Sequence, residues 1–173
     1  YKEAFDLLSR IETCLTEGES ASGKPMSALR YKTAKERANM YIKLKNAPKV
    51  KENLSRMEEI AKANPSLNTD LLYSQANYYY TFGLNSQGDA AINKLIDRYQ
   101  QEKDYGKAND CYRQLIEMAT RNGNARLVAR TYDRYNHWSD SIRALTAQDE
   151  LNVMKRKYDE SLKTIEDKDG SIK

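Results

Sequence analysis

The sequence is poor in the residues that build turns, disulfides and metal sites. Its 173 residues include seven glycines, three prolines, two cysteines and one histidine. Turns recur about every 8–12 residues in a β-sandwich, so this shortage of Gly and Pro argues against that fold. Cys14 and Cys111 form neither a CxxC motif nor a metal-binding spacing. We expect both to be small buried hydrophobic residues, and we expect no bound metal.

Candidates for catalysis are also scarce. No Gly-rich phosphate loop is present, and no Ser/His/Asp or Cys/His arrangement is indicated. The one histidine, His137, lies between Tyr135 and Trp138, which favours packing at a helix end over acid–base work. We therefore predict no catalytic residues, no cofactor and no enzymatic activity.

Neither long apolar runs nor charge of one sign dominates the chain. No apolar run reaches the roughly 18 residues of a membrane span. Lys and Arg total 29 and Asp and Glu total 25, giving a net charge of +4, and the two signs are interleaved. A nucleic-acid interface needs a basic stripe, so we expect no nucleic-acid partner. Because the chain starts at Tyr1 without Met, we expect it to be a piece of a longer protein.

Apolar residues recur at steps of three and four along most of the chain, which is typical of amphipathic helices. The pattern predicts an all-α protein, with a loop at residues 18–25 and Pro25 in the first turn of a helix. A cap is predicted at residues 68–70. The predicted helices are residues 1–15, 25–45, 48–63, 71–82, 91–99, 104–120, 125–135 and 139–166.

Part of this pattern repeats. Ala38 and Tyr41 recur as Ala76 and Tyr79, at an offset of 38 residues. A small residue lets a paired helix approach closely, and the aromatic three residues later lies on the same face. The second helices of the two copies then correspond as Val50, Leu54 and Met57 with Gly88, Ile92 and Leu95.

At Ala76, Tyr79 and Gly83 the chain resembles the tetratricopeptide-repeat (TPR) family, whose pattern has a small residue, an aromatic and a turn Gly. The first copy has Lys45 at the turn, and the offset exceeds the family's usual length of about 34 residues. The third copy, residues 104–138, matches only at Ala108, Tyr112 and Tyr132. The resemblance covers about residues 26–138 and implies an α-α superhelix of antiparallel helix pairs.

A second resemblance concerns the end of the array. Residues 132–142, followed by a long charged helix, look like the end of the extracytoplasmic repeat arrays of Bacteroidetes sensor histidine kinases. This implies a periplasmic sensor region of a two-component signalling protein, linked to the membrane only through its parent. On this basis we divide the chain into a repeat domain, residues 1–138, and a trailing helix and polar tail, residues 139–173.

Two functional hypotheses follow. The first is a non-catalytic sensor domain that binds a protein or other ligand and signals through a membrane-borne kinase. The alternative is a free-standing cytosolic TPR scaffold that mediates protein–protein interaction. Both need a binding partner, for which we expect a protein or peptide, and the sequence does not identify it.

Two sets of residues are candidate binding sites. In the resembled family the first helix of each pair lines an inner groove, which here implies Lys35, Asn39, Lys43, Tyr73, Asn77 and Tyr80. A Lys and two Asn could hold a peptide carboxylate, as in some chaperone-binding TPR domains, but a general peptide groove is favoured. The basic row Arg126, Arg130 and Arg134 shares one helix face. Pairing with carboxylates is favoured there over an anion site.

The last helix carries a narrow apolar seam. Its members are Leu151, Met154, Tyr158, Leu162 and Ile165, at steps of three, four, four and three. This spacing with charged flanks is of coiled-coil type. We expect the helix to cap the last pair up to about residue 151 and, beyond it, to form a homodimer with a second copy.

Overall fold

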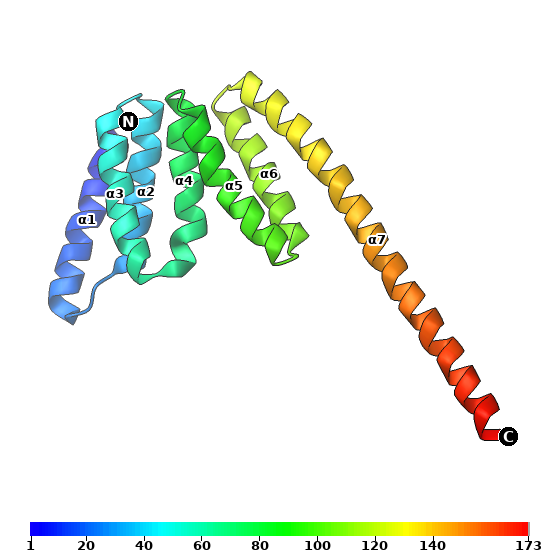
Figure 1. Cartoon of the computed structure of the whole chain (residues 1–173). Helices are drawn as coiled ribbons and strands as arrows, with labels where there is room; N and C mark the ends of the chain where they lie inside the picture. The colour runs from blue at the N-terminus through cyan, green and yellow to red at the C-terminus, as the bar shows by residue number, and fades with distance from the viewer. Residues whose placement is uncertain (173) are drawn as a thin grey trace. The chain divides into compact units, whose positions relative to one another are not determined.

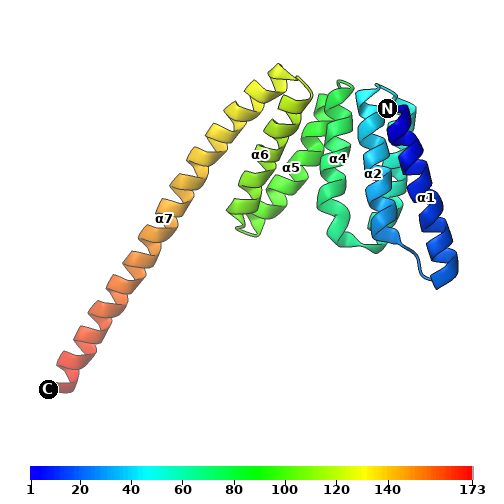
Figure 2. The ribbon, with the colours of Figure 1, turned by 180° about the vertical axis from the view of Figure 1, so that it is seen from behind.

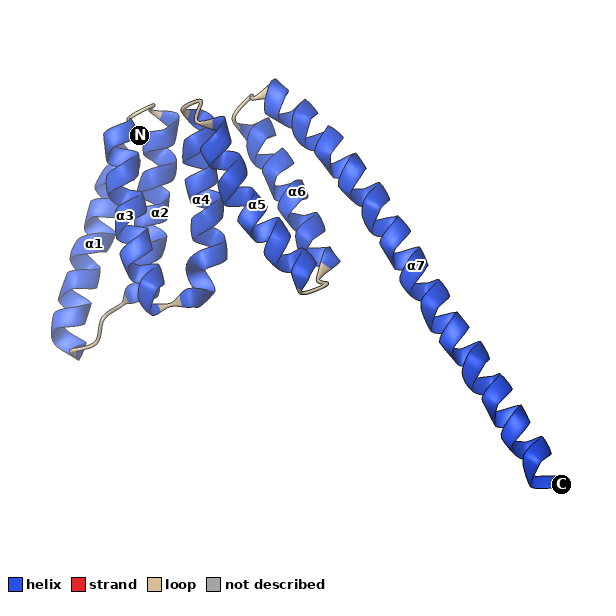
Figure 3. Ribbon diagram, in the orientation of Figure 1, coloured by secondary structure: helices blue, strands red, loops and turns tan. Residues whose placement is uncertain are grey.

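A computed structural model describes residues 1–172 of the backbone and the side chains of residues 1–168. Over this range the protein is all-α, as predicted, with no strand (Figure 1 and Figure 3). The elements are α1 (Lys2–Ser22), α2 (Ser27–Lys43), α3 (Ala47–Ala63), the 3₁₀ helix η1 (Pro65–Leu67), α4 (Asn68–Thr81), α5 (Asn85–Gln101), α6 (Tyr105–Arg121) and α7 (Ala125–Ile172).

The chain divides into two compact units. The first runs from Tyr1 to Met118 and holds α1 to α5 with most of α6, and the second begins at Ala119. This division reflects compactness alone. The functional boundary that we place after residue 138 therefore stays a prediction.

Neighbouring helices of the first unit pack side by side, α2 against α3 and α4 against α5 (Figure 1). One apolar cluster joins the first pair to α4. It is formed by Tyr31, Ala34, Ala38, Ile42, Val50, Leu54, Met57, Ala61, Leu71 and Tyr78. On α2 and α3 its members recur every three or four residues, so each helix buries one stripe. Figure 2 shows α1 alongside α2 at the N-terminal end.

Four short turns share one geometry. The second residue of each is left-handed: Lys45 (φ 58°), Gly83 (φ 77°), Lys103 (φ 57°) and Gly123 (φ 68°). The next N–H bonds a carbonyl five residues back, in Asn46–Tyr41 (3.0 Å), Leu84–Tyr79 (2.7 Å), Asp104–Tyr99 (2.8 Å) and Asn124–Ala119 (2.9 Å). These bonds satisfy carbonyls that a helix end leaves free. Lys45 thus occupies the same conformation as Gly83.

Three of these turns also cap the helix that follows. Asn46 accepts a bond from the N–H of Lys49, Asp104 from that of Lys107, and Asn124 from that of Leu127. The helix cap predicted at residues 68–70 is wrong, because η1 runs directly into α4. The N-cap residue of α4 is Leu67, and it makes no capping hydrogen bond through its side chain.

The first loop is shorter than expected. α1 continues to Ser22 and ends at Gly23, so Gly18 is helical. A Cβ atom at Gly18 would lie 2.8 Å from Cε of Met26, so the end of the Met26 side chain packs closely against α1 at this point. Pro25 also lies outside the helix it was expected to begin, since the N-cap of α2 is Met26.

α7 is one continuous helix, where the sequence predicted two separated by residues 136–138. That segment contains neither Pro nor Gly, so nothing in it stops a helix once one has formed. Among the described residues, no helix is both long enough and apolar enough to span a bilayer.

Candidate functional site

A hollow of about 690 Å³ opens between α1, α2 and α3, within the first unit. Its lining residues are Ser9, Glu12, Thr13 and Thr16 of α1, Arg30, Thr33 and Ala34 of α2, and Arg56, Glu59 and Ile60 of α3. Ligand sites in proteins commonly enclose roughly 300–1,000 Å³, so this hollow is of suitable size. It is the candidate site on which the functional argument rests.

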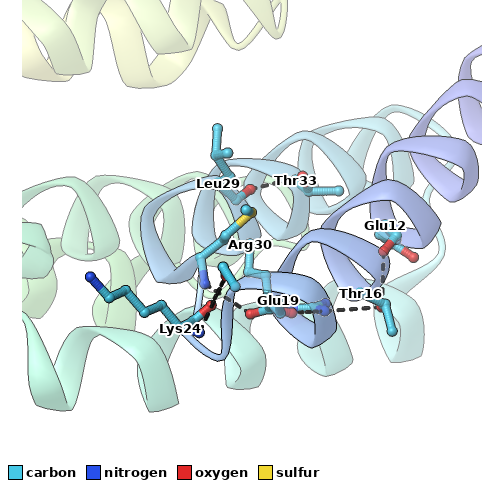
Figure 4. Close-up of polar contacts among 9 residues, drawn as sticks. Glu12, Thr16, Glu19, Lys24, Leu29, Arg30 and Thr33 are labelled. Carbon is cyan, nitrogen blue, oxygen red and sulfur yellow. Dashed lines mark hydrogen bonds and ion pairs between the residues drawn. The ribbon is translucent and has the colours of Figure 1, made fainter.

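Hydroxyl groups line the hollow and offer acceptors. Thr13 donates to the carbonyl of Ser9 at 3.1 Å. Thr16 donates to the carbonyl of Glu12 (3.0 Å) and buried Thr33 to that of Leu29 (2.8 Å) (Figure 4). Each hydroxyl proton is therefore used within its own helix. The oxygen of Thr16 already accepts from Arg30, while that of Thr13 keeps its lone pairs for another donor. The walls suit a ligand that carries N–H or O–H groups.

An ion pair fixes one end of the hollow. Nε of Arg30 donates to Glu19 (2.7 Å), and its NH2 group donates to Thr16 (3.1 Å) (Figure 4). The other oxygen of Glu19 accepts the N–H of Met26 at 2.8 Å. The bonds from Arg30 and then Met26 lower the pKa of Glu19, and the bond to Glu19 raises the pKa of Arg30. Together they tie α1 to the start of α2 and hold the two walls at a fixed spacing.

A second, smaller hollow of about 210 Å³ shares Glu12 and Arg56 with the first. Arg37 is paired there with Glu12 and donates to Ser9 at 2.9 Å. Asn53 also lines it and is only 2 % exposed. Its amide nitrogen donates to the carbonyl of Lys49 at 2.8 Å, while its Oδ1 has no hydrogen-bond partner.

The predicted groove residues lie elsewhere, and several of them already join helices. Nζ of Lys35 lies 2.5 Å from Oδ1 of Asp70, and the hydroxyl of Tyr31 donates to Oδ2 at 2.6 Å. Asp70 of α4 thus holds two residues of α2. Burial, and then a hydrogen bond with Cys111 of α6, raise the pKa of Tyr73.

The other members of that set differ in exposure. Asn39 and Asn77 are half-buried, and Lys43 is exposed at the end of α2. Tyr80 is 3 % exposed, and its hydroxyl donates to Asp89 of α5 at 2.5 Å. Most of the Tyr80 side chain therefore serves the packing of α4 on α5, with little of it left to meet a ligand.

The predicted basic row lies on the first part of α7. Arg126 and Arg130 are exposed and Arg134 is half-buried. Arg130 and Arg134 both have interaction partners within the protein. Whether the row binds an anion stays a prediction.

Two expectations about single residues are wrong. The side chain of His137 is 82 % exposed, and its Nε2 lies 3.7 Å from Oδ1 of Asp133, so it does not pack at a helix end. Cys14 is exposed because it lies beside the buried stripe of α1, not on it. Cys111 is buried as expected, and this burial raises the pKa of its thiol.

Sequence reasoning missed the hollow because it looked for the binding residues in the repeated helices. A signal was present in α1, where Ser9, Thr13 and Thr16 recur at steps of four and three. This spacing aligns three hydroxyls on one helix face. The partner wall, however, comes from α3, and spacing along α1 cannot predict it.

No group of three or more His, Cys, Asp or Glu residues in the described part of the chain is placed to hold a metal ion. Comparison with protein-family models, with curated proteins and with solved structures gives no match to this chain.

Proposed function

We propose that this chain is a non-catalytic binding module of TPR-like architecture, and that it binds a peptide segment of a partner protein. Two observations support the architecture. The helix pairs α2/α3 and α4/α5 share a 38-residue sequence offset. The turns within both pairs have a left-handed residue at the same position, and the same hydrogen bond closes them. A stack of such pairs offers extended surfaces suited to protein ligands.

The hollow between α1, α2 and α3 carries the functional part of the proposal. A peptide in extended conformation presents free N–H groups, and the hydroxyl oxygen of Thr13 can accept a hydrogen bond from one of them. Arg56 and Glu59 on the α3 wall supply charges of both signs, and Ala34 and Ile60 supply apolar surface. The hollow therefore matches a segment of mixed character better than a uniformly charged ligand.

The cellular role rests on the resemblance to extracytoplasmic sensor arrays. We propose that the module senses its ligand in the periplasm as part of a membrane-borne kinase of the two-component type. Reading the gene on both sides of the chain tests this role. A signal peptide upstream and an apolar span of about 20 residues downstream would support it. A complete reading frame with neither would favour the cytosolic scaffold, in which the same hollow would bind a partner.

The site itself is tested by filling it. Thr13 is exposed on the α1 wall, so Thr13→Trp adds a large ring to the hollow without disturbing the core. Leu7→Trp is the matched control, because Leu7 is 58 % exposed on the same helix and does not line the hollow. Peptides selected from a random displayed library on the natural protein are then titrated against both variants by fluorescence anisotropy, after thermal unfolding has shown that both are folded.

We expect Thr13→Trp to weaken the selected peptides by about tenfold or more, which corresponds to about 1.4 kcal/mol, and Leu7→Trp to leave their affinity unchanged. Equal affinity for the natural protein and Thr13→Trp would show that the peptides bind elsewhere. Failure to select any peptide that prefers this protein to an unrelated helical protein would overturn the peptide-binding role altogether.

A further inference from the structure

α7 carries two apolar seams along its length. The first consists of Leu127, Thr131, Tyr135, Trp138, Ile142 and Leu145, and the second of Leu151, Met154, Tyr158, Leu162 and Ile165. Between them lies a polar stretch, residues 146–150, whose only apolar side chain is that of Ala147. Both seams keep steps of three or four, so each follows one face of the helix.

The two seams occupy opposite faces of α7. Ile142 and Leu151 are nine residues apart, and so are Leu145 and Met154. Nine residues make about two and a half turns of an α-helix, so the apolar face changes sides by about half a turn. Because the helix is unbroken here, the second seam cannot continue the packing of the first.

Burial separates the seams in the same way. Leu127 is 5 % exposed and Thr131 is 1 % exposed. Each residue of the second seam, by contrast, is at least 42 % exposed, and Met154 reaches 66 %. The first seam is thus covered at its start by the chain itself, while the second presents five large apolar side chains to solvent.

We propose that the second seam binds the same seam of another copy of this chain, as a parallel, in-register two-stranded coiled coil. In a heptad register with Leu151 and Tyr158 at position a and Met154 at position d, Glu150 falls at g and Lys155 at e. In a parallel dimer Glu150 faces Lys155 of the other copy, and this attraction occurs twice by symmetry. In the antiparallel pairing, Met154 would lie against Tyr158 of the other copy. Lys155 would then lie beside Lys155 of the other copy, and Lys157 beside its Lys157, and these contacts between like charges are repulsive.

The contact is short and its strength is correspondingly modest. The seam spans about two heptads, and helices of this length are marginal when isolated. We therefore expect a concentration-dependent dimer. This inference is independent of the proposed peptide site, because it uses neither α1 nor α3.

Disulfide trapping of the whole chain tests both the partner and its direction. Cys14→Ser first removes the exposed thiol, and buried Cys111 is kept. Met154→Cys and Ile165→Cys then place thiols at positions d and a of the second seam. Arg156→Cys is the exposed control on the far side of α7, and Leu145→Cys tests the first seam. Circular dichroism checks that each variant keeps its helix content before mild oxidation.

A parallel, in-register pair brings each residue at positions a and d beside its own copy, so Met154→Cys and Ile165→Cys should each give about tenfold more covalent dimer than Arg156→Cys or Leu145→Cys. Equal trapping at all four positions would overturn the proposal, because it would reflect random collision. Trapping only in a mixture of Met154→Cys and Tyr158→Cys would also overturn it, in favour of antiparallel pairing. As a second readout, Met154→Glu should abolish the dimer in sedimentation equilibrium while Arg156→Glu should not.

Discussion

The two helix pairs of the first unit fill the corresponding contact between their helices with different residues. Where α2 meets α3, Ile42 and Val50 are both buried, at 4 % and 0 % exposure. At the same positions of the second pair, 38 residues on, stand Tyr80 and Gly88. A Cβ atom on Gly88 would lie 2.8 Å from Cζ of Tyr80. Two medium side chains in one pair thus correspond to a large and a minimal one in the other.

The two helix pairs therefore fill the same contact with different combinations of side-chain size. A small residue at one position permits a ring at its partner, and the reverse also holds. Matching position by position therefore understates the likeness of the copies, as it does for Val50 and Gly88.

The largest expected effect comes from breaking the volume balance. Gly88→Val should lower the free energy of unfolding by about 2–3 kcal/mol, because Tyr80 is buried and its ring has no space to move into. Adding Tyr80→Ile, which recreates the residues of the first pair, should recover much of this loss. Urea denaturation followed by circular dichroism measures both.

A matched glycine provides the control. Gly106 is exposed on α6, and the nearest atom to an added Cβ is Oδ1 of Asp104 at 3.9 Å. Gly106→Ala should stabilise the protein by about 0.5–1 kcal/mol, as removal of a helical glycine usually does. If the double variant instead loses the sum of the unfolding free energies lost by Gly88→Val and by Tyr80→Ile, the two positions are not coupled. That result would contradict the compensation between positions 80 and 88.

The next effect concerns the tie between the pairs. Asp70→Ala removes the acceptor of the buried Tyr31 hydroxyl and should cost about 1–3 kcal/mol. Burial and then the bond to Asp70 raise the pKa of Tyr31, so the hydroxyl needs an acceptor while it stays protonated. In a Tyr31→Phe background the same substitution should cost clearly less, as measured by urea denaturation. If Asp70→Ala lowers the free energy of unfolding equally in both backgrounds, the loss comes from the ion pair with Lys35 or from helix α4 itself, and not from the Tyr31 hydroxyl.

A smaller effect separates the two turns. Lys45 holds a left-handed conformation that is strained for residues other than glycine, so Lys45→Gly should stabilise the protein by about 0.5–1 kcal/mol. Gly83→Lys, the reciprocal change, should destabilise it by a similar amount. Thermal unfolding compares them. Destabilisation by Lys45→Gly would mean that the lysine makes a contact that offsets its strain.

The smallest effect depends on pH and concerns how α1 is held against the first pair. Because the bond from Arg30 lowers the pKa of folded Glu19, this carboxylate contributes stability above its unfolded pKa of about 4.3. That contribution is lost as pH falls through the lower, folded value. Glu19→Gln should therefore have a lower urea midpoint than the natural protein at neutral pH, and the gap should close in strong acid. A gap that persists in acid would assign the effect to packing at Met26.

The periodic apolar pattern was sufficient to predict the helices, because each buries one stripe and the stripes recur at steps of three and four. It failed to place two of the helix ends. Gly18 resembles a loop residue in sequence, yet it lies within α1, which continues to Ser22. Similarly, the segment containing His137 looks like a helix end, but nothing in it terminates the helix.

The candidate site was the least predictable part. Its walls come from three helices, and only their packing brings Thr13 close to Arg56 and Ile60. The resemblance to the TPR family predicted a binding groove that includes Lys35 and Tyr80. In the structure these two side chains bond to residues of neighbouring helices. Spacing along the sequence indicates which side chains share a face, and it does not indicate which faces meet.

The continuity of α7 has a mechanical consequence. Its 48 residues make a rod of about 70 Å, since an α-helix rises 1.5 Å per residue. A rod of this length acts as a lever: a tilt of only about 5° at its first turn displaces its last turn by about 6 Å. An angular change too small to disturb side-chain packing at one end thus becomes, at the other, a displacement longer than a full helical turn.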